Sequence, residues 1–461
     1  MTKSWSTSGV DLHLAMPASG GRRERLEAAL RAAIRDGRLA AGDRVPSTRA
    51  LAGQLGLSRG TVTAAYDQLV AEGFLRAGQG SGTTVAPLPA PARAVGSRDP
   101  ATSPPDLDLT PGSPDVASFP TATWLRAARR ALGSAPARAM GYGDPRGRPE
   151  LRTALADYLG RTRGVVVSPA QVVVTTGYVQ ALHLLATVTA AGEVATEDPG
   201  LPFHRDVLRA AGRTVVPLPV DEHGALPPDP SHSRTRLAVL TPAHQYPTGV
   251  PLAPQRRHAL VAWARDADAV LLEDDYDGEF RYDRQPVGAL QAMDPEHVVY
   301  AGSTSKTLAP GVRVGWMVLP SRLLEPVVEA KRHLDLQTGV VDQLTVADLL
   351  VSHDYDRHVR SMRLRYRRRR DRLLEVLGRH AGRHVRGQLP RSIPAGLQLV
   401  VRVPDEASVL ARAAEHGLAL SGLAGHFHRR ERALQGLVVG FARPSEGGYP
   451  RALEALARVL P

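Results

Sequence analysis

The chain of 461 residues is 43 % hydrophobic, which is enough for two or more domains with cores of their own. It contains no cysteine, which excludes disulfides, zinc–thiolate sites and thiol nucleophiles, and no apolar run approaches the length of a membrane-spanning helix or has the form of a signal peptide. The formal net charge of +12 is uneven, because residues 1–98 hold 13 Lys or Arg against 7 Asp or Glu, and such a basic end favours a nucleic-acid partner. We therefore expect a soluble, cytoplasmic protein that binds no membrane.

Residues 22–85 have the pattern of a helix-turn-helix followed by a wing. Apolar residues recur at helical spacing in "RRERLEAALRAAIRDG", which predicts a first helix. Ser47 and Ser58 are expected to cap two shorter helices, with the tight turn between them at Gly56, and the glycine-rich residues 74–85 are typical of a two-stranded wing. A recognition helix enters the major groove of DNA with its first residues leading. The DNA contacts predicted on this ground are Ser58, Arg59, Thr61 and Thr63.

The segment "VPSTRALAGQLGLSRGTVTAAYDQLVAEGFL", with the wing after it, resembles the winged helix of the GntR-type bacterial regulators. The sequence departs from the family pattern at Gly60, where many members have a hydroxylated residue, and at Gln79, where some have histidine. The resemblance implies contacts with double-stranded DNA from Arg49, Ser58, Arg59, Thr61 and Thr63, and from Gly80 at the tip of the wing.

The composition changes after Val85, where "APLPAPARAVGSRDPATSPPD" is rich in proline, alanine and small polar residues and lacks an apolar period. Proline-rich segments of this kind are extended linkers. We therefore expect a winged helix-turn-helix domain at residues 10–85, a linker at 86–107 and a second domain at 108–461.

In the second domain, β-rich apolar runs such as "QVVVTTG", "RLAVLTPAH", "DAVLLEDDYDGEF" and "HVVYAGSTSK" alternate with helical segments. This alternation predicts an α/β domain with a largely parallel sheet covered on both faces. Ligands of such sheets bind beyond the carboxyl ends of the strands. The polar residues that close the runs are therefore the site candidates, namely Thr176–Gly177, Asp198–Pro199, His244–Gly249, Asp274–Tyr276 and Ser303–Lys306.

Several of these residues have the chemistry that pyridoxal 5'-phosphate (PLP) requires. Lys306 in "STSK" can form a Schiff base with the cofactor aldehyde, and Asp274 can keep the pyridine nitrogen protonated. The phenol of Tyr276 can hydrogen-bond the ring oxygen. We expect burial and cationic neighbours to lower the pKa of Lys306. The phosphate can be held by the helix start after "TTG" together with Ser303, Ser305 and Arg313.

The stretch from "GYGDPRGRPELRTALADYLGRTRGV" to the C-terminus resembles the fold-type I aminotransferase superfamily, and with the winged helix the whole chain resembles the MocR subfamily of GntR-type regulators. The resemblance implies a winged helix-turn-helix (α+β) joined to an α/β fold-type I PLP-dependent aminotransferase-like domain. It also implies a homodimer in which Tyr142 reaches the partner's cofactor. The residues implied to bind PLP are Lys306 (the Schiff-base lysine), Asp274, Tyr276, Tyr246, Ser303, Ser305, Arg313, Gly177 and the amides of Tyr178 and Val179.

Two departures from the superfamily concern the substrate site. Leu201 replaces the tyrosine of an "EDPGY" segment, and a valine precedes Phe441 where enzymes of the superfamily have a carboxylate-binding arginine. Arg205 and Arg443 are the nearest guanidiniums for an effector carboxylate. A weakened substrate site suits a sensor, which needs different affinities for two states and no catalytic cycle.

The function we expect is a PLP-dependent, DNA-binding transcriptional regulator that senses PLP or an amino compound, without physiological turnover, although partial transamination is compatible with the domain. The alternative is an active aminotransferase with an accessory DNA-binding module, and a third possibility is a DNA-binding regulator whose second domain takes no cofactor. We expect the arginine-rich residues 363–377 to be the solvated face of a helix rather than a second DNA-binding surface. "HFHRR" at 426–430 is expected to be a polar loop, and no metal site is predicted.

Overall fold

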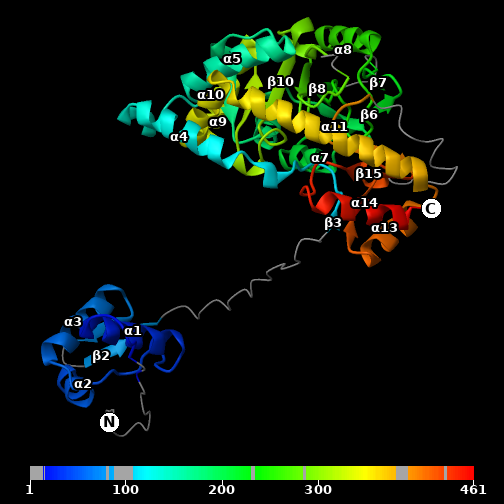
Figure 1. The fold of residues 1–461 in the computed structure, drawn as a ribbon. Coiled ribbons are helices and arrows are strands. Elements are labelled where there is room, and N and C mark those ends of the chain that lie inside the picture. The colour runs from blue at the N-terminus through cyan, green and yellow to red at the C-terminus, as the bar shows by residue number, and fades with distance from the viewer. Residues whose placement is uncertain are drawn as a thin grey trace. The chain divides into compact units, whose positions relative to one another are not determined.

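The computed structural model describes Leu14 and residues 16–78, 82–87, 107–229, 234–283, 287–380, 393–429 and 433–460 (Figure 1). The chain divides into two compact units, Met1–Thr102 and Ser103–Pro461. Within the described ranges, no helix has both the length and the hydropathy that crossing a membrane requires.

The N-terminal unit is a winged helix-turn-helix, as predicted. The side chain of Ser47 accepts a hydrogen bond from the Ala50 amide at 3.2 Å, and that of Ser58 accepts one from the Thr61 amide at 3.1 Å, so each serine caps its helix. Gly56 takes the left-handed conformation that the turn between the helices needs. Its elements are α1 (Arg22–Arg35), α2 (Thr48–Leu55), α3 (Arg59–Ala71), β1 (Leu75–Gly78) and β2 (Gly82–Val85).

The second unit is built on an eight-stranded sheet in the order β4-β11-β10-β9-β8-β5-β6-β7. The strands from β10 to β6 are parallel to their neighbours, whereas β11 is antiparallel to both β10 and β4, and β7 is antiparallel to β6. The largely parallel sheet predicted from the sequence is therefore present. The strands are β4 (Val172–Thr175), β5 (Glu193–Asp198), β6 (Thr214–Asp221), β7 (Gly224–Ala225), β8 (Thr235–Leu240), β9 (Val270–Asp274), β10 (Val298–Ser303) and β11 (Gly315–Val318).

Helices cover both faces of this sheet, which explains why β9 is buried along its whole length. Val173 and Val299 pack with α6 and α9 on one face, while Val174 and Tyr300 pack with α5 and α10 on the other. The helices are α4 (Thr121–Ser134), α5 (Pro149–Arg163), α6 (Tyr178–Val188), α7 (Pro202–Ala210), α8 (Pro254–Asp266), α9 (Ser321–Asp335), α10 (Val340–Val351) and α11 (Asp354–His380). Short 3₁₀ turns occur at Val116–Ser118, Ala137–Met140, Pro169–Gln171, Leu290–Met293, Pro310–Val312 and Ala424–His426.

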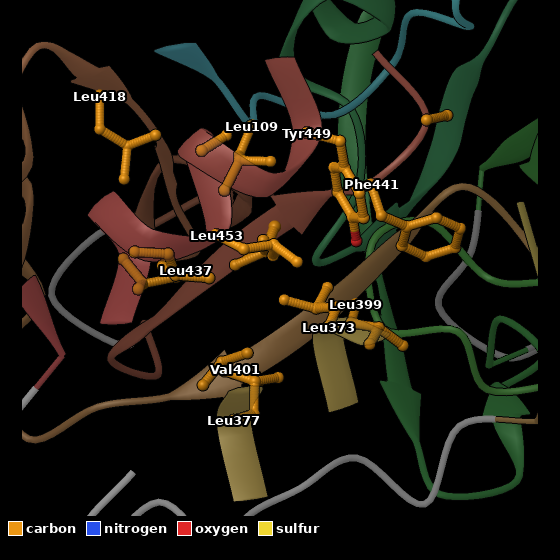
Figure 2. Close-up of a cluster of buried hydrophobic side chains, with 14 of the residues drawn as sticks. Leu109, Leu373, Leu377, Leu399, Val401, Leu418, Leu437, Phe441, Tyr449 and Leu453 are labelled. Carbon is orange, nitrogen blue, oxygen red and sulfur yellow. The ribbon is translucent and has the colours of Figure 1, made fainter. Parts of the chain in front are cut away.

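The C-terminal part of this unit forms a smaller layer with its own apolar core. A three-stranded sheet in the order β12-β15-β14 packs against α13 and α14, and a second, two-stranded sheet pairs β3 with β13. Figure 2 shows that Leu109, which lies immediately after β3, belongs to this core with Leu399, Phe441 and Leu453. The elements are β3 (Leu107–Asp108), β12 (Gln398–Arg402), α13 (Glu406–Glu415), β13 (Leu418–Ala419), β14 (Ser421–Gly422), β15 (Gly436–Gly440) and α14 (Gly448–Val459).

Candidate functional site

A cavity of about 340 Å³ lies beyond the carboxyl ends of β5, β8, β9 and β10. This is where a largely parallel sheet places its ligands, because the polar loops after its strands converge there. The residues of the predicted cofactor set that line the cavity are Tyr178, Val179, Tyr246, Asp274, Tyr276, Ser303, Ser305, Lys306 and Arg313.

Lys306 lies in the turn that follows β10, and its Nζ donates a hydrogen bond to the carbonyl oxygen of Gly112 at 2.5 Å. Burial lowers the pKa of the Lys306 amine, whereas the nearby carboxylates of Asp274 and Asp277 act to raise it. The expectation of cationic neighbours was therefore wrong, since the charged groups that act on this amine are anions. Burial alone favours the free amine that attack on an aldehyde requires.

Asp274 is the last residue of β9, and its carboxyl group is buried. Burial raises its pKa well above the ordinary value, and the charge of Lys306 opposes that shift. A buried carboxylate of this kind needs a positive partner, which a protonated pyridine ring nitrogen supplies.

Two tyrosines bound the cavity beside Asp274. The hydroxyl of Tyr276 donates to the carbonyl oxygen of His244 at 3.1 Å and accepts from Nε2 of Gln398 at 2.9 Å. The rings of Tyr246 and Tyr276 are perpendicular, with centroids 6.0 Å apart. Burial raises the pKa of Tyr276, so its phenol stays neutral, and its single O–H, which the His244 carbonyl accepts here, would have to turn to donate to a ring oxygen.

The start of α6 has the features of a phosphate site. Gly177 precedes the helix with φ of 122°, and a Cβ at this position would lie 3.1 Å from the guanidinium of Arg313. The amides of Tyr178 and Val179 belong to the first helical turn, where no intrahelical acceptor is available. Glycine therefore allows the guanidinium of Arg313 to approach the start of α6 closely, so that both can face the same anion.

A hydrogen-bonded chain supports this loop from behind. Oε1 of Gln180 accepts from the Thr176 amide at 2.8 Å, and Nε2 of Gln180 donates to Asp335 at 2.7 Å. Asp335 in turn forms an ion pair with Lys331, which is fully buried in α9. Lys331 thus has a structural partner, and it does not line the cavity.

Sequence reasoning missed Glu197 and His204, which also line the cavity. Glu197 accepts hydrogen bonds from Oγ1 of Thr241 at 2.5 Å and from Nε2 of Gln245 at 3.2 Å, and burial raises its pKa to about 7. The ring of His204 packs on that of Tyr178 with centroids 4.7 Å apart, and burial lowers its pKa to about 3. Asp198, which we had selected instead, accepts from the His428 amide at 2.9 Å and is not part of the lining. The position of Glu197 at a strand end was the available signal.

Arg205, Arg443 and Tyr142 lie outside the lining of the cavity. Arg205 is buried and donates to the carbonyl oxygens of His426 at 2.8 Å and Phe427 at 3.3 Å. Arg443 forms an ion pair with Asp108 at 2.9 Å. Neither guanidinium therefore lines the cavity, and both have partners elsewhere. Tyr142 is 91 % exposed, so its predicted contact with a partner's cofactor needs a second subunit.

Residues of the arginine-rich segment and of "HFHRR" also have structural roles. Arg369, in the arginine-rich part of α11, is buried and forms an ion pair with Asp115 at 2.9 Å, so the solvated-face interpretation does not hold for this residue. His426, in the segment expected to be a polar loop, is buried, and its ring packs edge-on against that of Tyr246 with centroids 5.4 Å apart. Among the described residues, no three His, Asp or Glu side chains are grouped so as to hold a metal ion.

In the N-terminal unit, the predicted DNA contacts lie on the exposed side of the helix-turn-helix. Arg49 on α2 and Arg59 and Thr63 on α3 are exposed, as is Ser58 at the cap. Thr61 is half-buried, and its hydroxyl lies 2.8 Å from that of Ser58. Gly80 is outside the described residues.

Comparison with known proteins agrees with this architecture. The family "Aminotransferase class I and II" matches residues 105–419, and "Bacterial regulatory proteins, gntR family" matches residues 22–85. The chain is 35 % identical to the "HTH-type pyridoxine biosynthesis transcriptional regulator PdxR" of Corynebacterium glutamicum, over 90 % of this chain and 91 % of that protein. It is 34 % identical to the "Probable rhizopine catabolism regulatory protein MocR" of Rhizobium meliloti, over 90 % of this chain and 88 % of that protein. The crystal structure of kynurenine aminotransferase from Pyrococcus horikoshii superposes with a TM-score of 0.70 at 26 % identity, covering 78 % of this chain and 91 % of that one.

The fold and the cavity thus define a helix-turn-helix transcriptional regulator with an aminotransferase-like domain. The chain belongs to the aminotransferase class I and II family and, through its gntR-family domain and its full-length relatives, to the MocR type of regulator. Members of the aminotransferase family bind PLP.

Proposed function

We propose that this chain is a transcriptional regulator whose affinity for DNA is controlled by PLP bound in the cavity at Lys306. The observation that carries the proposal is the convergence of Lys306, Asp274 and Arg313 on one cavity in a chain that also has a winged helix. Bound PLP supplies an aldehyde and an electron-withdrawing ring. Because the gntR family consists of bacterial regulatory proteins that bind DNA, we also propose that this chain acts in the cytoplasm.

The residues of the chain fit that group by their chemistry. Lys306 offers a partly buried amine whose pKa burial lowers, and Asp274 offers a buried carboxylate for a ring nitrogen that carries a proton. Arg313 and the amides at the start of α6 offer positive charge and hydrogen-bond donors to a phosphate. Each of the three groups of the cofactor would therefore meet a complementary partner.

The residues that line the cavity also indicate which class of effector it can bind. Among the lining residues that the structure describes, the cations are Lys306 and Arg313, and both are needed by PLP. His204 adds no charge because burial lowers its pKa to about 3. At the rim, Phe203 is 56 % exposed and Leu201 lies beside it. Besides Lys306 and Arg313, these lining residues offer no cation for a carboxylate, so we favour PLP itself as the effector, and an amine without a carboxylate as the second choice.

We further propose that the regulator is a homodimer. Leu125 on α4 and Leu334 and Leu336 at the end of α9 are large apolar side chains that are more than half exposed. Gln337 holds the loop of Tyr142, since its Oε1 accepts from the Gly143 amide at 2.6 Å and its Nε2 donates to the Gly141 carbonyl at 3.2 Å. A fixed, exposed tyrosine next to apolar side chains fits an interface between two copies. Sedimentation of the PLP-loaded protein at micromolar concentration should show a dimer, and a monomer would contradict this proposal.

The deciding experiment is a titration of DNA binding with PLP. DNA that the full chain selects from a random library is bound at fixed salt, and PLP is then added, followed by 2-phenylethylamine or phenylalanine. We expect PLP to change the affinity for DNA. We expect 2-phenylethylamine to change it further, and phenylalanine to have no effect. An affinity that ignores PLP would contradict the proposal. Sustained release of keto acid from amino donors would instead support the alternative of a working aminotransferase.

A further inference from the structure

Residues 107–112 join the end of the predicted linker to the wall of the cavity. At their start, β3 pairs in parallel with β13, with Leu107 opposite Leu418. Leu109 is fully buried in the C-terminal core shown in Figure 2. Its amide donates to the Ala419 carbonyl at 3.0 Å, and its carbonyl accepts from the Gly440 amide at 2.7 Å. The start of the segment is therefore held by the C-terminal core.

Arg443 adds a side-chain clamp to this segment. Its Nε lies 2.9 Å from Oδ2 of Asp108, and its Nη1 donates to Oγ1 of Thr110 at 2.6 Å. The backbone approaches so closely here that a Cβ on Gly440 would lie 2.6 Å from the Thr110 carbonyl oxygen. Arg443 thus connects two residues of the segment to the loop that follows β15.

The other end of the segment meets the reactive lysine. Pro111 and Gly112 line the cavity, and the Gly112 carbonyl accepts the hydrogen bond from Nζ of Lys306. When Nζ bonds to the aldehyde carbon, the aldehyde oxygen leaves with two hydrogens as water, and at most one N–H remains on the nitrogen. A neutral product would have no N–H left for Gly112, and in a protonated product the ring oxygen would be a second acceptor for the one N–H. The covalent bond to the cofactor would therefore compete with the hydrogen bond to Gly112.

We propose that residues 107–112 connect Lys306 to the linker, so that formation of the covalent bond at Lys306 changes how firmly the end of the linker is fixed. Arg443 and Asp108 are the residues that position this segment. This inference rests on the proposed function, because it requires PLP to bind at Lys306 and to alter DNA affinity. Without PLP, the segment is held at both ends, by the C-terminal core and by Lys306. With PLP bound, the hydrogen bond from Lys306 to Gly112 is lost. Residues 107–112, from which the linker leads to the DNA-binding unit, are then less firmly fixed.

The test uses the full chain with Arg443→Gln, and Arg443→Lys as the variant that restores the charge. We expect Arg443→Gln to bind PLP within about threefold of wild type, while the PLP-induced change in DNA affinity falls to about twofold or less. Arg443→Lys should recover part of that change. Hydrogen exchange of a peptide that covers 107–115 should become faster in wild type when PLP is added, and should already be fast in Arg443→Gln without PLP.

Arg256→Gln is the matched control, because Arg256 forms a comparable, partly exposed ion pair with Asp221 at 2.6 Å outside the cavity lining. It should leave the PLP response unchanged. This inference alone would be overturned if PLP changed the DNA affinity of Arg443→Gln as much as that of wild type. It would also be overturned if PLP changed the DNA affinity of wild type but left hydrogen exchange at 107–115 unchanged. Loss of PLP binding in Arg443→Gln would also overturn it, since Arg443 would then belong to the binding site. A wild type whose DNA affinity does not respond to PLP would overturn the proposed function itself.

Discussion

Burial, rather than a neighbouring cation, lowers the pKa of the Lys306 amine, since Asp274 and Asp277 act in the opposite direction. Asp274 is the carboxylate that most strongly favours the charged form of this lysine. If Asp274 paired with the protonated ring nitrogen of the proposed cofactor, its effect on Lys306 would be weaker, and the free amine would be favoured.

The first prediction concerns Lys306→Ala. We expect this variant to fold and bind DNA but to lose the link to PLP that borohydride fixes, because the remaining lysines cannot replace it. The full sequence contains only Lys3, Lys306 and Lys331, so mass mapping has three possible positions. Lys331 is fully buried and paired with Asp335 at 2.7 Å. A pyridoxyl group found on Lys331 in wild type would contradict the assignment.

The second prediction concerns pH and Glu197. Its pKa is raised from 4.5 to about 7 by burial, so the folded chain keeps a proton that the unfolded chain releases between these values. The free energy of unfolding therefore falls as the pH rises from 4.5 to 7, and Glu197→Gln should reduce that fall by about 1 to 3 kcal/mol. Urea unfolding of the PLP-free protein at pH 5 and pH 8, followed by tryptophan fluorescence, measures this. Glu415→Gln, an exposed control, should unfold like wild type. If the free energy of unfolding fell equally between pH 5 and pH 8 in wild type and in Glu197→Gln, Glu197 would not be the group that holds the proton.

At the scale of elements, the start of α6 is positioned by groups that do not touch a ligand. Gln180 connects the Thr176 amide to Asp335 at the end of α9, and Asp335 is paired with Lys331. Two helices on one face of the sheet are thereby tied to the loop that presents Gly177. Buried lysines are costly unless paired, so the pair also fixes the end of α9.

The third prediction tests this support with Gln180→Ala. Loss of two hydrogen bonds, each worth about 1 kcal/mol, should loosen the phosphate loop and weaken PLP binding by about tenfold. An absorbance titration with PLP measures the dissociation constant. Thr187→Ala is a suitable control on the same helix, since the Thr187 side chain is exposed and bonds only to the His183 carbonyl at 2.9 Å. Unchanged affinity in Gln180→Ala would mean that the loop keeps its shape without this support.

At the scale of the whole molecule, the DNA-binding unit and the aminotransferase-like unit have separate cores, each described by its own cluster of buried residues. A surface change in the first unit therefore leaves the core of the second unit intact.

The fourth prediction uses this separation. Arg59→Ala should weaken binding to DNA by about 1 to 3 kcal/mol, through loss of a base or phosphate contact at the start of α3, and should leave PLP absorbance unchanged. Binding isotherms at matched salt, with and without PLP, measure both effects. Arg22→Ala, at an exposed arginine at the start of α1, provides a comparison within the same unit and should bind DNA like wild type. If Arg59→Ala binds as tightly as wild type, Arg59 is not a DNA contact.

Local pattern was sufficient for the winged helix-turn-helix and for the main strands of the second unit. Serine caps, a turn glycine and apolar spacing act within a few residues, so they predicted the helix-turn-helix and its wing. Strand ends in a parallel sheet meet at one edge, so the rule that ligands bind there brought Lys306 and Asp274 together without knowledge of the strand order. The antiparallel direction of β11 was not predicted, because it depends on pairing with β4, far away in the sequence.

The sequence by itself thus determined the two-domain organisation, the winged helix, the largely parallel sheet and the chemistry of the residues at the strand ends. Only the tertiary structure decided which polar groups face the cavity and which are used elsewhere. Glu197 and His204 line it, whereas Arg205 donates to backbone carbonyls and Arg369 is buried against Asp115. The contact of Lys306 with Gly112 joins residues 194 positions apart. Such partners are chosen by packing and desolvation, which depend on the assembled core and leave no periodic signal in the chain.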